Sequence, residues 1–133
     1  MRCNISRNMI FLPRRIRGRG QFVQYLLLIY ENENRFSQGY DKAEIEEYQG
    51  FGKRFSKNIR GGNALQPTNT AKTVRVRNSK PVNSDGPFAE TKEQLGGFYL
   101  IDAKDMNEAM TVAAEIPAAR FGSIEVRPIM TFS

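Results

Sequence analysis

The stretch Val23-Gln-Tyr-Leu-Leu-Leu-Ile-Tyr30 is short, almost wholly apolar and rich in residues that favour β-structure. It ends in a polar cluster, Glu31-Asn-Glu-Asn34, and this pattern predicts a buried strand. A second stretch of the same kind follows later, Gly97-Phe-Tyr-Leu-Ile101. Both stretches carry apolar residues at odd and even positions, so both faces of the predicted sheet require an apolar cover.

Two helices are predicted, one between these strands and one after them. Asp41 is the expected N-cap of the first helix, with Glu44 as its capping partner and Gly61-Gly62 as its stop. We interpret its apolar positions as a core stripe: Ile45, Tyr48, Phe51, Phe55 and Ile59. Asp105 caps the second helix and Pro117 stops it. The expected apolar face of this helix is Met106, Ala109, Met110, Ala113 and Ile116.

The remaining strands are shorter. Thr73-Val-Arg-Val-Arg77 alternates strictly between apolar and polar residues, which predicts a strand. Asn78-Ser79 favours a tight turn, and Lys80-Pro-Val-Asn83 is the expected return strand, with Pro81 indicating an edge position. A last strand lies within Gly122–Met130, with Ile124 and Val126 directed inward. The order of elements predicts an α+β fold of ferredoxin-like plan, βαββ(β)αβ, with an antiparallel sheet and both helices on one face. A second copy of the chain is the expected cover of the other face, so we expect a homodimer.

Length and charge limit the class of protein. The chain has 133 residues, which argues for one domain, and its net charge is +6. Six of the 20 basic residues lie in residues 1–22, and the other 14 balance the 14 acidic residues. A neutral body makes nucleic acid an unlikely partner except through the basic N-terminal extension. The longest apolar run is far below the roughly 20 residues that span a bilayer, which makes a membrane partner unlikely. The single cysteine, Cys3, excludes an internal disulfide and favours the cytoplasm.

Residues 1–22 form a basic extension that we expect to be disordered and dispensable, whereas residues 23–133 form the domain. Val23 is the expected natural start, because an internal GTG codon is read as valine and Arg17-Gly-Arg-Gly20 is what a translated purine-rich ribosome-binding stretch would encode. The alternative is a basic arm that contacts nucleic acid or anionic lipid by charge alone.

Several segments together carry a family resemblance: Tyr25–Tyr30, Gly62–Pro67, Thr73–Arg77, Asp85–Asp102 and Gly122–Met130. They resemble the YCII-related family, specifically its DGPF-domain group. The resemblance implies a dimeric α+β barrel in a bacterial, cytoplasmic protein, often encoded beside alternative sigma factors. It also implies lyase-like chemistry, which some members perform through a His and an Asp. This chain contains no histidine, and Asn63 stands where the group commonly has Glu.

Without histidine, nucleophilic triads and zinc sites are excluded, and any acid or base must be a carboxylate, Lys, Tyr or water. We expect no cofactor and no metal. The segment DGPFAETKEQLGG, residues 85–97, is the expected wall of a small-molecule pocket near the dimer interface. Candidate catalytic residues are Asp85, Glu90, Lys92 and Glu93. Candidate ligand-binding residues are Tyr30, Arg75, Thr91, Glu125 and Arg127.

The alternatives for these residues are structural. Asp85 could fix a turn, Lys92 could form a salt bridge that orders the loop, and Glu125 could simply pair with Arg127. Two functions stay open. One is a lyase- or isomerase-like enzyme, and the other is a non-catalytic ligand-binding or regulatory module, including one linked to sigma-factor-dependent transcription.

Overall fold

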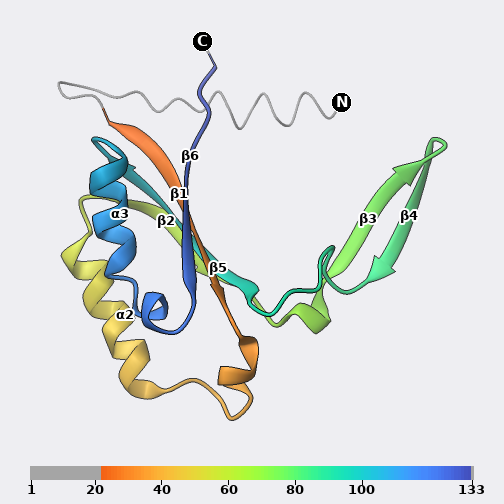
Figure 1. Cartoon of the computed structure of the whole chain (residues 1–133), viewed down its shortest axis with the longest axis horizontal. Helices are drawn as coiled ribbons and strands as arrows, with labels where there is room; N and C mark the ends of the chain where they lie inside the picture. Colours follow the sequence, from red (N-terminus) through yellow and green to blue (C-terminus); the bar gives the residue numbers. More distant parts are fainter. Residues whose placement is uncertain (1–21, 133) are drawn as a thin grey trace.

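A computed structural model describes residues 22–132 of the chain, and the predicted extension lies outside the described residues except for Phe22. Four strands form an antiparallel sheet in the order β2-β5-β1-β6. Helices α2 (Lys42–Arg54) and α3 (Met106–Ala114) lie against one face of this sheet (Figure 1). The fold is therefore α+β with antiparallel sheets, as predicted, and the strand order is consistent with a ferredoxin-like plan.

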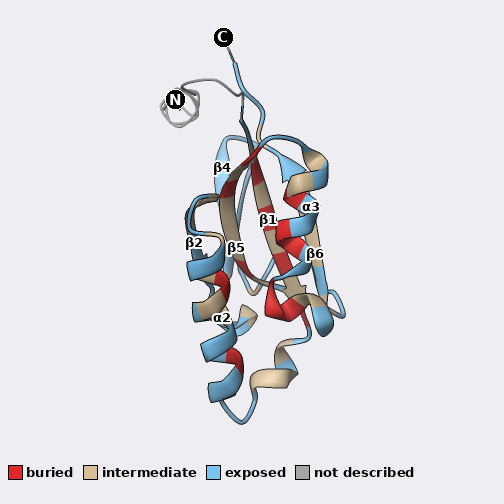
Figure 2. Ribbon diagram, turned by 90° about the vertical axis from the view of Figure 1, so that its left-hand side faces the viewer, coloured by how far each residue is buried: buried red, intermediate tan, exposed pale blue. Residues whose placement is uncertain are grey.

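Strand β1 (Val23–Glu31) lies in the middle of the sheet, between β5 (Gln94–Ala103) and β6 (Ser123–Pro128). Its exposure alternates residue by residue, and Tyr25, Leu27 and Ile29 are buried against the helices. Figure 2 shows the buried residues gathered on this side of the sheet and on the helix surfaces that meet it. The core therefore forms between one sheet face and the helix layer.

The other face of the sheet, which we call the open face, carries apolar side chains that no helix within residues 22–132 covers (Figure 1). Its central apolar residues are half-buried rather than buried: Leu26, Leu28, Phe98 and Leu100. Register confirms that they share one face, because Leu26 lies opposite Leu100 and Leu28 lies opposite Phe98. The prediction that the central strands are apolar on both faces is confirmed.

Helix α2 begins as predicted but ends early. The Asp41 carboxylate accepts a hydrogen bond of 3.1 Å from the amide of Ala43. The helix ends at Arg54, and Ile59–Ala64 is not its last turn but strand β2, paired with β5. The predicted stop at Gly61-Gly62 was therefore wrong. The chain turns after Phe55, and the amide of Ile59 donates to the carbonyl oxygen of Phe55 as it would in a helix. The sequence spacing of the apolar residues therefore could not distinguish a longer helix from a turn followed by a strand.

The predicted core stripe of α2 is confirmed in part, since Phe51 is fully buried and Tyr48 and Phe55 pack against the core. Ile45 is exposed instead, and Ile59 packs against the core from β2 rather than from the helix. In α3 the Asp105 carboxylate accepts a hydrogen bond of 2.9 Å from the amide of Glu108, as a cap should. Its predicted face needs one correction. Met110 is exposed and Val112 is buried instead.

After Ile116 the chain forms a 3-10 turn, η3 (Pro117–Arg120), and then enters β6. Ile124 and Val126 pack against the core, as predicted.

Strands β3 (Lys72–Arg77) and β4 (Lys80–Asp85) form a separate two-stranded sheet, which we call the arm. The arm extends away from the main sheet and the helices (Figure 1). Asn78 and Ser79 both have positive φ, 52° and 66°, which suits the tight turn of a two-residue hairpin. The predicted hairpin is confirmed, but its strands do not join the main sheet. None of the helices in residues 22–132 is long and apolar enough to cross a membrane.

Candidate functional site

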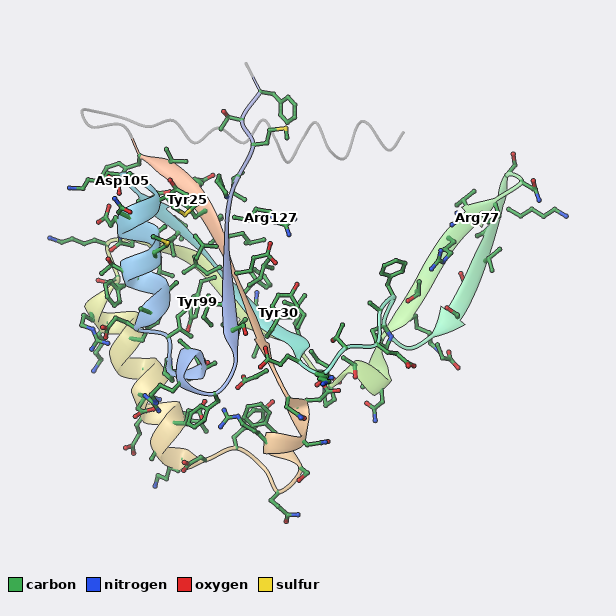
Figure 3. All side chains as sticks on the ribbon, viewed as in Figure 1. Tyr25, Tyr30, Arg77, Tyr99, Asp105 and Arg127 are labelled. Atoms are coloured by element: carbon green, nitrogen blue, oxygen red, sulfur yellow. The ribbon has the colours of Figure 1, made fainter. Side chains whose placement is uncertain are left out.

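A cleft of about 800 Å³ opens on the helix side of the sheet. Its walls come from the 3-10 turn η1 (Glu33–Phe36), the first half of α2, and the edge formed by β2 and β5. Aromatic side chains make up much of the lining, including Phe36, Tyr40, Tyr48 and Tyr99. The labelled Tyr99 lies on the helix side of the sheet in Figure 3.

Two carboxylates of the cleft lining are bound by one guanidinium. Glu31 ends β1 with 7% of its surface exposed, and Glu44 lies in the first turn of α2 with 9% exposed. The Nη2 of Arg35 donates to Glu31 Oε1 at 2.9 Å and to the Glu44 carboxylate at 3.0 and 3.1 Å. We call Glu31, Arg35 and Glu44 the charge cluster. Because Glu44 is held by Arg35, its predicted role as the capping partner of Asp41 was wrong.

The position of Arg35 follows from its local sequence. Asn32 caps η1 by accepting a 2.9 Å hydrogen bond from the amide of Asn34, which turns the chain directly after β1. The guanidinium is stacked on the ring of Phe121, with Cζ 3.9 Å from the ring centre. The same Cζ lies 4.8 Å from the ring centre of Phe36. Two rings and two carboxylates therefore hold Arg35 in place.

The charge cluster has one negative charge in excess. Burial raises the pKa of Glu31, against the hydrogen bond and positive charge of Arg35, and the charges of Glu44 and Glu93 add to the rise. Burial would lower the pKa of Arg35, but its hydrogen bonds to Glu44 and Glu31 outweigh this effect and raise it. The guanidinium therefore stays charged, and Glu31 binds a proton more readily than an ordinary glutamate.

Two tyrosines of the cleft lining keep their protons. Burial raises the pKa of Tyr48, and the charges of Glu31 and Glu44 raise it further. Burial also raises the pKa of Tyr99. Both phenols are consequently neutral hydrogen-bonding groups at physiological pH, and Tyr48 is the one close to the charge cluster.

The rim of the cleft is tied together by Glu33. Its carboxylate accepts a hydrogen bond of 3.0 Å from the amide of Thr68 and another from the Thr68 hydroxyl. Its own amide donates to Gln94 Oε1 at 3.0 Å. These bonds link η1 to β5 and to the segment that leads into the arm.

Gly97 completes this edge, because a Cβ there would lie 3.0 Å from the carbonyl oxygen of Asn63. Gly97 therefore allows the backbones of β5 and β2 to pack closely.

The charges of the cleft lining are all of one sign. Within the described residues, four carboxylate side chains contribute to it and no Lys or Arg does. The four are Glu31, Glu33, Asp41 and Glu44. In the same part of the chain no group of three His, Cys, Asp or Glu side chains could hold a metal ion. The chemistry available is therefore hydrogen bonding, proton transfer by carboxylate, and attraction of positive charge.

The site residues predicted from residues 85–93 lie outside the cleft lining. Asp85 pairs with Lys72 at 2.6 Å, and both side chains are largely exposed. Glu93 accepts a 2.8 Å hydrogen bond from Ser123, and the Thr91 hydroxyl donates to the carbonyl oxygen of Glu93. Glu90 and Lys92 are exposed. The following residues of the same segment, Gln94, Gly96 and Gly97, do line the cleft.

The structure brings together three of the predicted ligand-binding residues on the open face. Tyr30, Glu125 and Arg127 share this face, and Arg127 Nε donates to Glu125 at 2.9 Å, which confirms their pairing. Tyr30 and Arg127 lie on the side of the sheet away from the helices in Figure 3. Arg75 lies apart on the arm, with its Cζ 5.0 Å from the ring centre of Phe88.

The sequence analysis missed the charge cluster. Glu31 and Arg35 are four residues apart in a segment interpreted as the polar end of a strand, and Glu44 fits a capping pattern equally well. Tyr48 was assigned only to the core. The one available signal was the spacing of Glu31 and Arg35, which becomes informative once η1 is known to follow β1.

The fold and cleft define a small α+β protein with a ferredoxin-like strand order and one acidic, aromatic-lined cleft beside its helix layer. The model of the YCII-related domain matches residues 23–133, so the chain belongs to this family, as its sequence predicted.

A curated relative matches part of the chain. An uncharacterised protein of Rhizobium meliloti (strain 1021) is 47% identical over 70 residues. The match covers 51% of this chain and 56% of the relative, so the chain spans little more than half the length of that protein.

Proposed function

We propose that this family member binds a small, mostly apolar molecule with a positively charged group in the cleft. The size of the cleft supports this, since about 800 Å³ falls within the roughly 300–1,000 Å³ of pockets that bury small ligands. The observation that carries the proposal is the lining, which combines aromatic rings with carboxylates and contains no basic side chain in the described residues.

The charge cluster explains why a cation is favoured. One guanidinium neutralises only one of two carboxylates, and the remaining negative charge is poorly solvated because both side chains are buried. Burial raises the pKa of Glu31, so that a bound proton neutralises this charge more readily. A ligand cation relieves it equally, and the faces of Phe36 and Tyr40 add attraction for positive charge. An anionic ligand would meet four carboxylates instead.

A lyase- or isomerase-like reaction is a second candidate, supported by the raised pKa of Glu31. A carboxylate tuned in this way suits a general base, and the neutral phenol of Tyr48 suits a hydrogen-bond donor to developing negative charge. These residues would replace the His and Asp that the family resemblance suggested. The alternative is a binding or regulatory module, including one in sigma-factor-dependent transcription, in which the ligand is held without being changed.

We propose in addition that the protein is a homodimer through the open face, where Leu26, Leu28, Phe98 and Leu100 are only half-buried. In this arrangement the cleft and the dimer interface lie on opposite faces of one sheet. The predicted residues Tyr30, Glu125 and Arg127 would then belong to the interface rather than to the cleft.

A matched pair of probes tests the ligand class. We expect 2-phenylethylamine to raise the melting temperature, whereas 3-phenylpropionate, of similar size and opposite charge, does not. Glu31→Gln should remove most of the amine effect. Glu115→Gln, which changes a half-exposed carboxylate paired with Arg54, should retain it. Equal stabilisation by the acid and the amine would contradict the proposal.

Chemistry and binding are separated by following the ligand itself. If the protein is a binding module, we expect an amine that stabilises it to be recovered unchanged. If the protein is an enzyme, we expect the amine to be converted. Mass spectrometry after prolonged incubation measures this directly. Conversion by the native protein that Glu31→Gln abolishes, while Glu115→Gln leaves it intact, would identify Glu31 as the base.

A further inference from the structure

The arm, residues 72–85, is an unusual element because it has apolar side chains but no core. Val74 and Val76 are 63% and 61% exposed, although valine is among the residues most often buried. Register places Val76 opposite Pro81, so Val74, Val76 and Pro81 lie on one face of the hairpin. The arm thus presents a narrow apolar strip to its surroundings.

Within the described residues, the hydrogen bonds that tie down the arm lie at its base, and Arg75 also contacts the ring of Phe88. The Thr73 hydroxyl donates to the carbonyl oxygen of Gly86 at 2.8 Å, and the amide of Gly86 donates to the carbonyl oxygen of Ala71 at 2.8 Å. Figure 1 shows the rest of the arm extending clear of the sheet and helices. An isolated two-stranded hairpin is at best marginally stable in water. The arm therefore requires a surface to pack on.

We propose that the arm of one copy packs against the body of a second copy, and that two arms exchanged in this way clasp the homodimer. The proposal rests on the dimer suggested above and is independent of the ligand in the cleft. The partner is a second copy of the same chain, because this chain carries both of the surfaces that need cover, the apolar strip of the arm and the open face. A dimer with two-fold symmetry would bury both surfaces at once.

Charge supports a second copy as the occupant. The arm contains four basic residues and one acidic residue, Lys72, Arg75, Arg77 and Lys80 against Asp85. The rest of residues 23–133 contains ten basic and thirteen acidic residues. An arm of charge +3 is therefore attracted to a body of charge −3, whereas two bodies without arms would repel each other.

The dimensions are also compatible. Each arm strand has six residues, and at roughly 3.4 Å per residue the arm is about 20 Å long. A sheet of four strands at a spacing of ~4.8 Å is of similar width. An arm can therefore reach along the partner and add its strip to the apolar contact of the open faces.

Sedimentation equilibrium of the full chain tests the proposal. We expect a dimer, and we expect Val74→Thr/Val76→Thr to raise its dissociation constant by about tenfold or more, because the strip becomes polar while strand propensity is kept. Met110→Asp changes an apolar side chain of α3 that is also exposed, at 48%, and should leave the constant unchanged. Circular dichroism of each variant establishes that the body has folded.

The outcomes separate the two proposals. A native chain that is monomeric at all concentrations overturns both the dimer and the clasp. A native dimer whose dissociation constant is unaffected by the two valine substitutions retains the open-face dimer and overturns the clasp. Raised salt should also weaken the native dimer, since the attraction between arm and body is screened. A dimer that salt leaves unchanged overturns the charge argument for the second copy.

Discussion

The cleft and the arm depart from the usual distribution of residues in opposite ways. In the cleft, charged side chains are buried next to aromatic rings, with Glu31 and Glu44 sharing one arginine. In the arm, valines are exposed and the charges lie in open solvent. Each departure costs stability in the isolated chain. We propose that a cationic ligand offsets this cost in the cleft and that a second copy of the chain offsets it in the arm.

Removing an arginine should have very different effects in the two regions. Arg35→Ala leaves two buried carboxylates without their counter-charge, and we expect a loss of about 3 kcal/mol of folding stability. Arg77→Ala on the arm removes an exposed side chain and should change stability by less than about 0.5 kcal/mol. Urea denaturation measures both. Similar losses in the two variants would mean that the charge cluster is not held as described.

A pair of adjacent glycines tests the packing of the cleft edge. A Cβ at Gly62 would lie 2.6 Å from the carbonyl oxygen of Phe98 and 2.8 Å from the ring of Tyr99, whereas one at Gly61 meets nothing within 4 Å. We expect Gly62→Ala to destabilise the protein by about 1–3 kcal/mol and Gly61→Ala to be nearly neutral. Melting curves compare them. Equal effects would contradict the close approach of β2 and β5.

These glycines also show why part of the fold was not predictable from sequence. The buried strands, the second helix and the hairpin follow from residue spacing that is visible locally, as at Leu27 or Val74. Strand β2, by contrast, reads Ile-Arg-Gly-Gly-Asn-Ala and has no strand pattern of its own. It is a strand because β5 pairs with it, and the glycines allow Tyr99 to lie close.

The site was harder to predict than the fold for the same reason. The charge cluster depends on contacts between β1, η1 and α2, and nothing in the sequence says that Glu44 faces Arg35 rather than the helix cap. The segment from Asp85 to Glu93 was prominent because of its charges. Most of these charges lie on the surface, and the residues next to this segment that line the cleft are Gln94, Gly96 and Gly97, none of them charged.

Stability should depend on pH through Glu31. Its pKa is raised in the folded protein, so the folded state binds this proton more tightly than the unfolded state. The contribution of Glu31 is therefore most favourable below its ordinary value of 4.5 and is lost as pH rises through the raised pKa. We expect Glu31→Gln to remove this part of the pH dependence, as measured by melting curves between pH 4 and pH 8. A native profile that the substitution does not alter would contradict the burial of this carboxylate.

The smallest effect is expected at the base of the arm. Asp85 pairs with Lys72, but both side chains are largely solvated, and such pairs contribute little. We expect Asp85→Ala to change the free energy of unfolding by less than about 0.5 kcal/mol. Lys72→Ala is the matched variant and should behave alike. A loss above 1 kcal/mol in either variant would show that the segment has a structural role beyond this ion pair.

Calorimetric titration of 2-phenylethylamine into three proteins compares the two regions in a single experiment. We predict that the native protein and Val74→Thr/Val76→Thr bind the amine alike, because the arm does not line the cleft. Glu31→Gln should bind it at least about tenfold more weakly, since the excess negative charge of the cleft is gone. Binding to Glu31→Gln with the native affinity, or no binding to the native protein, would contradict the assignment of the cleft as a site for organic cations.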